Sequence, residues 1–97
     1  MTDFSTSTLR LAVSQHAPHF GMVAENAARI RELARSCDAD LLLTPELSLT
    51  GYDVRDLVHE LALSPLQVSQ LLALEPGTAV ATGFIESSAT GVPYNSA

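Results

Sequence analysis

The 97 residues of this chain are enough for one small domain and too few for two. Hydrophobic residues make up 46% and charged residues 16%, which is typical of a globular protein and argues against disorder. The formal net charge of −6 argues against binding to nucleic acid or to an anionic membrane, so neither is expected as a partner.

The N-terminal part of the sequence begins with a predicted strand. Residues 9–16, LRLAVSQH, alternate in character, with Leu9, Leu11 and Val13 on one face and smaller or polar side chains on the other. Residues 22–37 then show helical periodicity, with apolar positions three and four residues apart. We therefore expect a strand that leads through a loop into an amphipathic helix.

A second strand is expected over residues 39–45, ADLLLTP. Its three leucines are continuous, which is typical of a strand covered on both faces. Pro45 has no amide hydrogen and ends the ladder of hydrogen bonds. A strand, a helix and a strand over about 35 residues have the size of a βαβ unit, so an α/β fold is predicted. Gly51 is placed to supply a positive φ in the turn that follows.

Two helices and a hairpin are predicted in the C-terminal half. Residues 54–63 favour a short helix, and residues 64–77 a clearer one that begins at the cap Ser64 and stops at Pro76. Residues 78–87 predict a third strand that contains Gly83, and residues 94–97 the start of a fourth. That last strand is shorter than the usual five or six residues. We expect an incomplete sheet and a larger domain of which residues 1–97 are the first part.

The sequence also limits the available chemistry. The five cationic residues are all arginines, so no mechanism that needs a lysine can be completed within these residues. Cys37 is the one cysteine, which excludes an internal disulfide and favours a reducing cytoplasm. His16, His19 and His59 have no partner at a zinc-ligand spacing. No metal site and no cofactor are expected.

Glu46 is the most informative single residue. It follows Pro45 directly, at the expected carboxyl end of the leucine strand, where functional groups collect in open α/β sheets. A carboxylate in that place suits a general base. The alternative is a surface glutamate in an ordinary turn between a strand and a loop.

Several segments resemble the carbon–nitrogen hydrolase (nitrilase) superfamily. The stretch ADLLLTPELSLTGY resembles the first catalytic motif of that family, with Glu46 after the proline and Tyr52 after the glycine. LRLAVSQ resembles the first strand of the family, Asn26 lies where its first helix often has an asparagine, and ATGFIE and YNSA resemble later strands. The resemblance covers nearly the whole chain in order. The stretch PELSLTGYDVRDL is also similar to the glutaminase domain of glutamine-dependent NAD synthetases.

The resemblance implies a four-layer αββα sandwich and a Glu–Lys–Cys triad. Residues 1–97 would be the N-terminal fragment of a single hydrolase domain, with Glu46 as the general base. Tyr52 would line the substrate pocket, or else pack as a buried aromatic with its hydroxyl on a local partner. Asn95 either bonds across the loops near the site or, the interpretation we favour, serves a turn at the strand start. In the family the lysine and the nucleophilic cysteine come after these segments, and Cys37 on the first helix is expected to be a buried structural residue.

The function predicted from the sequence is hydrolysis of a non-peptide carbon–nitrogen bond in a small amide or nitrile. The 97 residues alone are expected to be inactive, since they hold only the glutamate. The complete protein is expected to form a homo-oligomer. Two alternatives stay open: the glutaminase portion of an NAD synthetase, and a non-catalytic remnant or partner-binding piece that associates through its open sheet edge.

Overall fold

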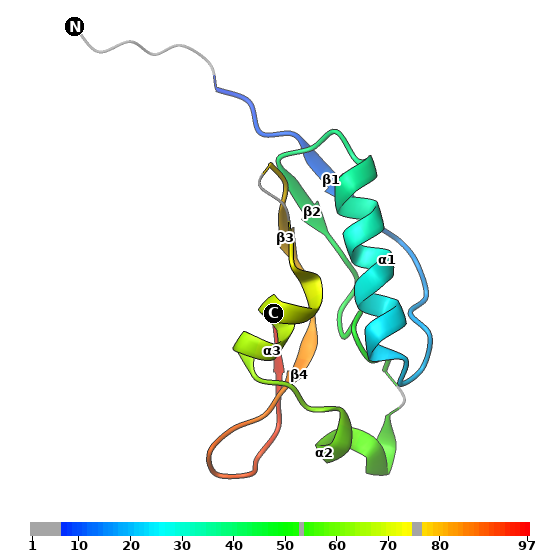
Figure 1. The fold of residues 1–97 in the computed structure, drawn as a ribbon, viewed down its shortest axis with the longest axis vertical. Coiled ribbons are helices and arrows are strands. Elements are labelled where there is room, and N and C mark those ends of the chain that lie inside the picture. The colour runs from blue at the N-terminus through cyan, green and yellow to red at the C-terminus, as the bar shows by residue number, and fades with distance from the viewer. Residues whose placement is uncertain (1–6, 53, 75–76) are drawn as a thin grey trace, which may run out of the picture.

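The computed structural model describes residues 7–52, 54–74 and 77–97 (Figure 1). Strands and helices alternate through most of the chain, as an α/β fold requires. The elements in chain order are β1 (Leu11–Val13), α1 (Val23–Ser36), β2 (Leu41–Leu43), the 3₁₀ helix η1 (Arg55–Leu57), α2 (Val58–Leu61), α3 (Pro65–Leu72), β3 (Ala79–Ala81), β4 (Phe84–Glu86) and β5 (Tyr94–Ser96).

The first three strands form a parallel sheet in the order β1-β2-β3. Leu11 lies opposite Leu41 in the register, and Leu41 lies opposite Ala79. The helix α1 connects β1 to its parallel neighbour β2 and runs alongside the strands in Figure 1. The predicted βαβ unit and the α/β fold class are therefore confirmed.

The single strand predicted over residues 78–87 is wrong. The segment forms two strands, because β3 belongs to the parallel sheet while β4 pairs with β5 in a separate antiparallel sheet. The interruption falls at Thr82 and Gly83. A Cβ atom on Gly83 would lie 2.4 Å from the backbone nitrogen of Leu47, so the turn after β2 presses directly on this point of the chain. The two strands are therefore separated where a distant segment lies close to the backbone.

The hydrophobic core lies between the helices and the sheets. It consists of side chains from α1, α3, β4 and the turn after β2, namely Ala27, Ile30, Leu49, Val68, Leu72 and Phe84. Val80 of β3 packs against this cluster, and its neighbour in the register is the buried Leu42. Since neighbouring residues in paired strands share a face, α1 covers the face of the parallel sheet to which Leu42 belongs.

The opposite face of the parallel sheet is largely exposed. Leu11 and Val13 of β1 are 52% and 63% exposed, and Leu9 is exposed as well. The leucine strand β2 is buried at Leu42, whereas Leu41 and Leu43 are only half-buried. Within the described residues, the second face of this strand is therefore only partly covered; that it is covered in a complete sandwich stays a prediction.

The helix α3 begins as its sequence predicts. The hydroxyl of Ser64 accepts a hydrogen bond from the backbone N–H of Gln67 at 3.1 Å, and the Gln67 side chain accepts one from the Ser64 N–H at 2.8 Å. The helix ends earlier than predicted, at Leu72, where Ala73 adopts a left-handed conformation with φ 40°. Pro76, the predicted stop, lies outside the described residues. In the part of the chain that the structure describes, none of the helices has both the length and the apolar character needed to cross a membrane.

Candidate active site

Glu46 opens a tight turn at the carboxyl end of β2. The turn spans residues 46–50, and the Glu46 side chain is exposed. The backbone N–H groups of Thr50 and Gly51 both donate to the carbonyl of Leu47, at 3.1 and 2.7 Å. Gly51 has a φ of 85°, as predicted for this position, and Leu47 also has a positive φ of 48°. The turn therefore holds a strained, defined conformation directly beside the candidate base.

A row of three hydroxyl groups lies under this turn. The Ser48 hydroxyl makes a 2.7 Å hydrogen bond to the Thr44 hydroxyl and another of 2.7 Å to the Thr82 hydroxyl. Ser48 is 0% and Thr82 6% exposed, so these two hydroxyl groups are shielded from water, whereas Thr44 is half-buried. Thr44 follows β2 and Thr82 follows β3, so this hydroxyl row joins the ends of two neighbouring strands. Sequence reasoning missed it, because Thr82 comes from a segment 34 residues after Ser48.

Asn95 is the partner of the Glu46 carboxylate. Its side-chain amide in β5 donates a hydrogen bond to Oε1 of Glu46, from a position 49 residues later in the chain. The favoured interpretation of Asn95 as a turn residue is therefore wrong, and the alternative, a bond across the loops near the site, holds. The signal available in the sequence was its place in the YNSA segment of the family resemblance.

Asn26 connects the loop before α1 to the same turn. Its buried side chain accepts a hydrogen bond from the backbone N–H of His19 at 2.8 Å and donates to the carbonyls of His19 and Leu49, at 2.8 and 2.9 Å. One amide group thus satisfies three backbone groups on two loops. The Glu46 turn is consequently held by α1 as well as by the strands.

Tyr52 lines an open hollow beside the turn. The hollow has a volume of about 750 Å³ and lies at the carboxyl ends of β1 and β2, with His16, Phe20, Pro45 and Tyr52 among its walls. Tyr52 is 62% exposed, so its ring is not packed in the core. In one wall the Ser14 hydroxyl hydrogen-bonds the Nδ1 atom of His16. Burial, with a smaller contribution from the Arg29 charge, lowers the pKa of His16.

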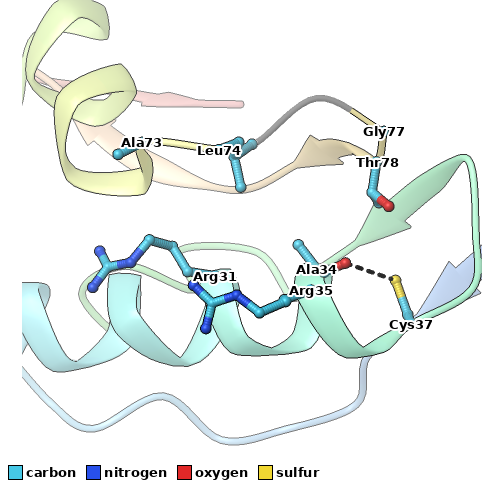
Figure 2. A pocket seen from close by; sticks show the side chains of 8 residues that line it. All are labelled: Arg31, Ala34, Arg35, Cys37, Ala73, Leu74, Gly77 and Thr78. Atoms are coloured by element: carbon cyan, nitrogen blue, oxygen red, sulfur yellow. Dashed lines mark hydrogen bonds between the residues drawn. The ribbon is translucent and has the colours of Figure 1, made fainter.

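Cys37 lies at the other end of the sheet from Glu46. It caps the C-terminal end of α1 ahead of β2, whereas Glu46 follows β2. Its Sγ atom is 3.6 Å from the carbonyl oxygen of Ala34 and points towards it in Figure 2, which shows the hollow of about 170 Å³ that these residues line. Cys37 is half-buried where full burial was expected. Its contacts fit a structural cysteine.

His16, His19 and His59 are the residues that the sequence offers as possible metal ligands. Within the described residues no three His, Cys, Asp or Glu side chains gather as a metal site requires. His16 is instead bonded to Ser14, and the backbone of His19 is bonded to Asn26.

Comparison with known proteins places the chain in a family. The model of the family described as carbon-nitrogen hydrolase matches residues 10–97. The chain therefore belongs to the carbon-nitrogen hydrolase family. The sequence resemblance that predicted this membership is confirmed.

Individual relatives agree with this assignment. The chain is 33% identical over 95 residues to a glutamine-dependent NAD(+) synthetase of Acinetobacter baylyi, covering 93% of this chain and 18% of that protein. It is 36% identical over 94 residues to a protein of Pseudomonas protegens named "Hydrolase in pqqF 5'region", covering 91% of this chain and 33% of that protein. The chain thus spans a third or less of the length of these relatives.

A solved structure has the same fold. The glutamine-dependent NAD+ synthetase from Acinetobacter baumannii, in complex with ADP, superposes with a TM-score of 0.76 and 29% sequence identity. The match covers 90% of this chain and 18% of that one. The α/β fold class, including its nitrilase-like arrangement, is thereby confirmed.

Proposed function

We propose that this chain supplies the general base of an enzyme that hydrolyses a non-peptide carbon–nitrogen bond in a small amide or nitrile. The observation that carries the proposal is the position of Glu46. An exposed carboxylate stands at the carboxyl end of a parallel strand, on a turn held by buried hydrogen bonds, in a member of the carbon-nitrogen hydrolase family. Residues 1–97 are taken to be the N-terminal part of one hydrolase domain.

The proposed mechanism follows from the family resemblance. A cysteine thiol attacks the carbon of the amide or nitrile and forms a thioester or a thioimidate. Glu46 takes the thiol proton and passes it to the leaving amine of an amide or to the nitrogen of a nitrile. Water then cleaves the thioester, which releases the acid and restores the thiol; a thioimidate first loses its nitrogen as ammonia to a water molecule. A lysine stabilises the negative charge that develops during the attack. Asn95 holds Oε1 of Glu46, which leaves proton transfer to Oε2. The lysine and the cysteine come from outside these 97 residues, so the isolated chain is predicted to be inactive.

The test is a Glu46→Gln substitution in the protein that carries this chain together with the lysine and the cysteine. We expect kcat to fall on the order of 100-fold or more, because the amide cannot accept a proton, while the fold is retained. Glu32→Gln is the matched control, since Glu32 is an exposed glutamate on α1 that pairs with Arg35 at 3.5 Å and lies away from the site. Near-normal turnover by Glu46→Gln would reject the assignment, as would turnover by the isolated chain that Glu46→Gln abolishes.

The second candidate is the glutaminase portion of an NAD synthetase. It is favoured by relatives that bear the name glutamine-dependent NAD(+) synthetase, including one from Synechocystis sp. that is 45% identical over 64 residues, covering 63% of this chain and 11% of that protein. Ammonia release from glutamine, compared with release from aliphatic amides and nitriles, separates the two candidates. The remaining alternative is a non-catalytic remnant or a partner-binding piece that associates through its sheet edge, and it is favoured if none of these compounds is hydrolysed.

Three further expectations accompany the proposal. Tyr52 is proposed to contact the substrate, since it lines the hollow together with Pro45, the residue before Glu46. Its replacement by alanine should raise KM more than it lowers kcat. Homo-oligomerisation of the complete protein and a cytoplasmic location stay predictions from the sequence.

A further inference from the structure

We propose that the hydroxyl row of Thr44, Ser48 and Thr82 positions Glu46, and that Thr82 is the positioning residue contributed by the neighbouring strand. The row lies between the Glu46 turn and the ends of β2 and β3. It touches no reacting atom in the proposed mechanism. Its effect on catalysis would be exerted through the backbone of residues 46–50.

Ser48 is the central member of the row. It belongs to the turn itself, two residues after Glu46, and it is fully buried. Its hydroxyl is bonded at 2.7 Å to Thr44 on one side and to Thr82 on the other. A rotation of the turn would break both bonds and deprive the buried hydroxyl groups of Ser48 and Thr82 of these partners, which is unfavourable. The half-buried Thr44 would keep its 3.3 Å bond to the Ala81 carbonyl. The row therefore restricts the turn to one orientation relative to the two strands.

Other bonds tie the turn to α1 and to the loop before it: Asn26 donates to the Leu49 carbonyl at 2.9 Å, and the Gly21 N–H donates to the Thr50 carbonyl at 2.8 Å. Neither bond fixes the turn relative to the parallel sheet. The backbone N–H of Leu49 donates to the carbonyl of Gly83 over a long 3.3 Å, and Gly83 limits how closely the turn can approach. Asn95 holds only the carboxylate, and it belongs to the other sheet. Among the residues that the structure describes, the hydroxyl row is the hydrogen-bonded connection that joins a side chain of the turn directly to the parallel sheet.

Thr82 offers the sharpest test because valine has nearly the same shape as threonine. Thr82→Val removes the hydroxyl and keeps the volume, whereas Thr82→Ser keeps the hydroxyl and removes a methyl group. Thr78→Val is the matched control. Thr78 precedes β3 at the opposite end, and its hydroxyl donates to the carbonyl of Ala39 at 2.9 Å.

The first measurement is amide hydrogen exchange of Thr50 and Gly51, whose N–H groups close the Glu46 turn. We expect Thr82→Val to speed their exchange by about ten-fold, because one buried hydrogen bond that holds the turn is lost. Thr82→Ser and Thr78→Val should leave the exchange near that of the unchanged protein. Unchanged exchange in Thr82→Val, or equally fast exchange in Thr82→Ser, would overturn the proposal. Thr44→Val, which removes the other end of the row, answers the same question if Thr82→Val does not fold.

The second measurement is steady-state kinetics, and it alone rests on the proposed role of Glu46. Thr82→Val should lower kcat by about ten-fold with little change in KM, since a misplaced base slows proton transfer more than it weakens binding. Thr82→Ser should restore kcat. An unchanged kcat beside faster exchange would overturn the catalytic part. If the unchanged protein hydrolyses no amide or nitrile, the proposed function fails, and the exchange data still decide whether the row positions the turn.

Discussion

Gly83 lies so close to the turn that carries Glu46 that a side chain there would meet its backbone, so Gly83→Ala tests the packing directly. Gly83 is not among the glycines with a positive φ. At such a position alanine ordinarily stabilises a protein by about 0.4–1 kcal/mol, because it restricts the unfolded chain. Here the new Cβ would lie 2.4 Å from the nitrogen of Leu47, although real Cβ contacts are essentially never under 3.0 Å. The two backbones must therefore separate by at least about 0.6 Å.

The expected net effect is a destabilisation of about 1–3 kcal/mol, the usual cost of overpacking. Urea denaturation measures it as a change in the free energy of unfolding. Exchange of the Leu49 amide, which donates to the Gly83 carbonyl, reports whether the turn has moved. Gly91→Ala is the control: its Cβ would meet nothing within 4 Å, and only its φ of 81° opposes the change. A Gly83→Ala protein as stable as the original, with unaltered Leu49 exchange, would refute the reasoning.

Three further predictions concern loops and helix ends. Asn26→Asp should destabilise the fold by about 2 kcal/mol or more, because a carboxylate oxygen would replace the amide nitrogen that donates to the carbonyls of His19 and Leu49. Urea denaturation measures the change, and an unchanged free energy of unfolding would contradict the buried hydrogen bonds. Ala73→Gly should raise the free energy of unfolding by up to about 1 kcal/mol, since Ala73 is left-handed and exposed; a loss of stability would contradict this. The pKa of His16 is lowered in the fold, so the protein should lose stability as the pH falls below 6.5, the ordinary pKa of histidine. The His16→Asn variant should lose less stability between neutral and acidic pH. Equal losses in the two proteins would refute the assignment.

Local patterns accounted for much of the fold. The amphipathic run from Val23 to Ser36, the leucines of β2 and the cap at Ser64 each depend on residues a few positions apart, and each was found where the sequence predicted. The short helix predicted over residues 54–63 is also found, as the helical turns η1 and α2, because it too depends on residues close together in the sequence.

The failures come from contacts between distant segments. The strand over residues 78–87 is divided at Thr82 and Gly83, where the Glu46 turn lies close to the backbone, and no pattern within that strand reveals this neighbour. The position of Glu46 was predictable from Pro45 and the strand before it. Its contact with Asn95 and the hydroxyl row beneath it depend on how β3 and β5 lie beside that turn.

The division of residues 79–86 between two sheets has a consequence for engineering the protein. Only Thr82 and Gly83 separate β3 from β4, and side chains alternate between faces along a strand. One inserted residue there would turn the buried Phe84 and Ile85 towards the opposite faces of their sheet. The hairpin loop over residues 87–93 has no such limit, since a Cβ on Gly91 meets open space. Fluorescent labels, epitope tags and grafted peptides therefore belong in that loop.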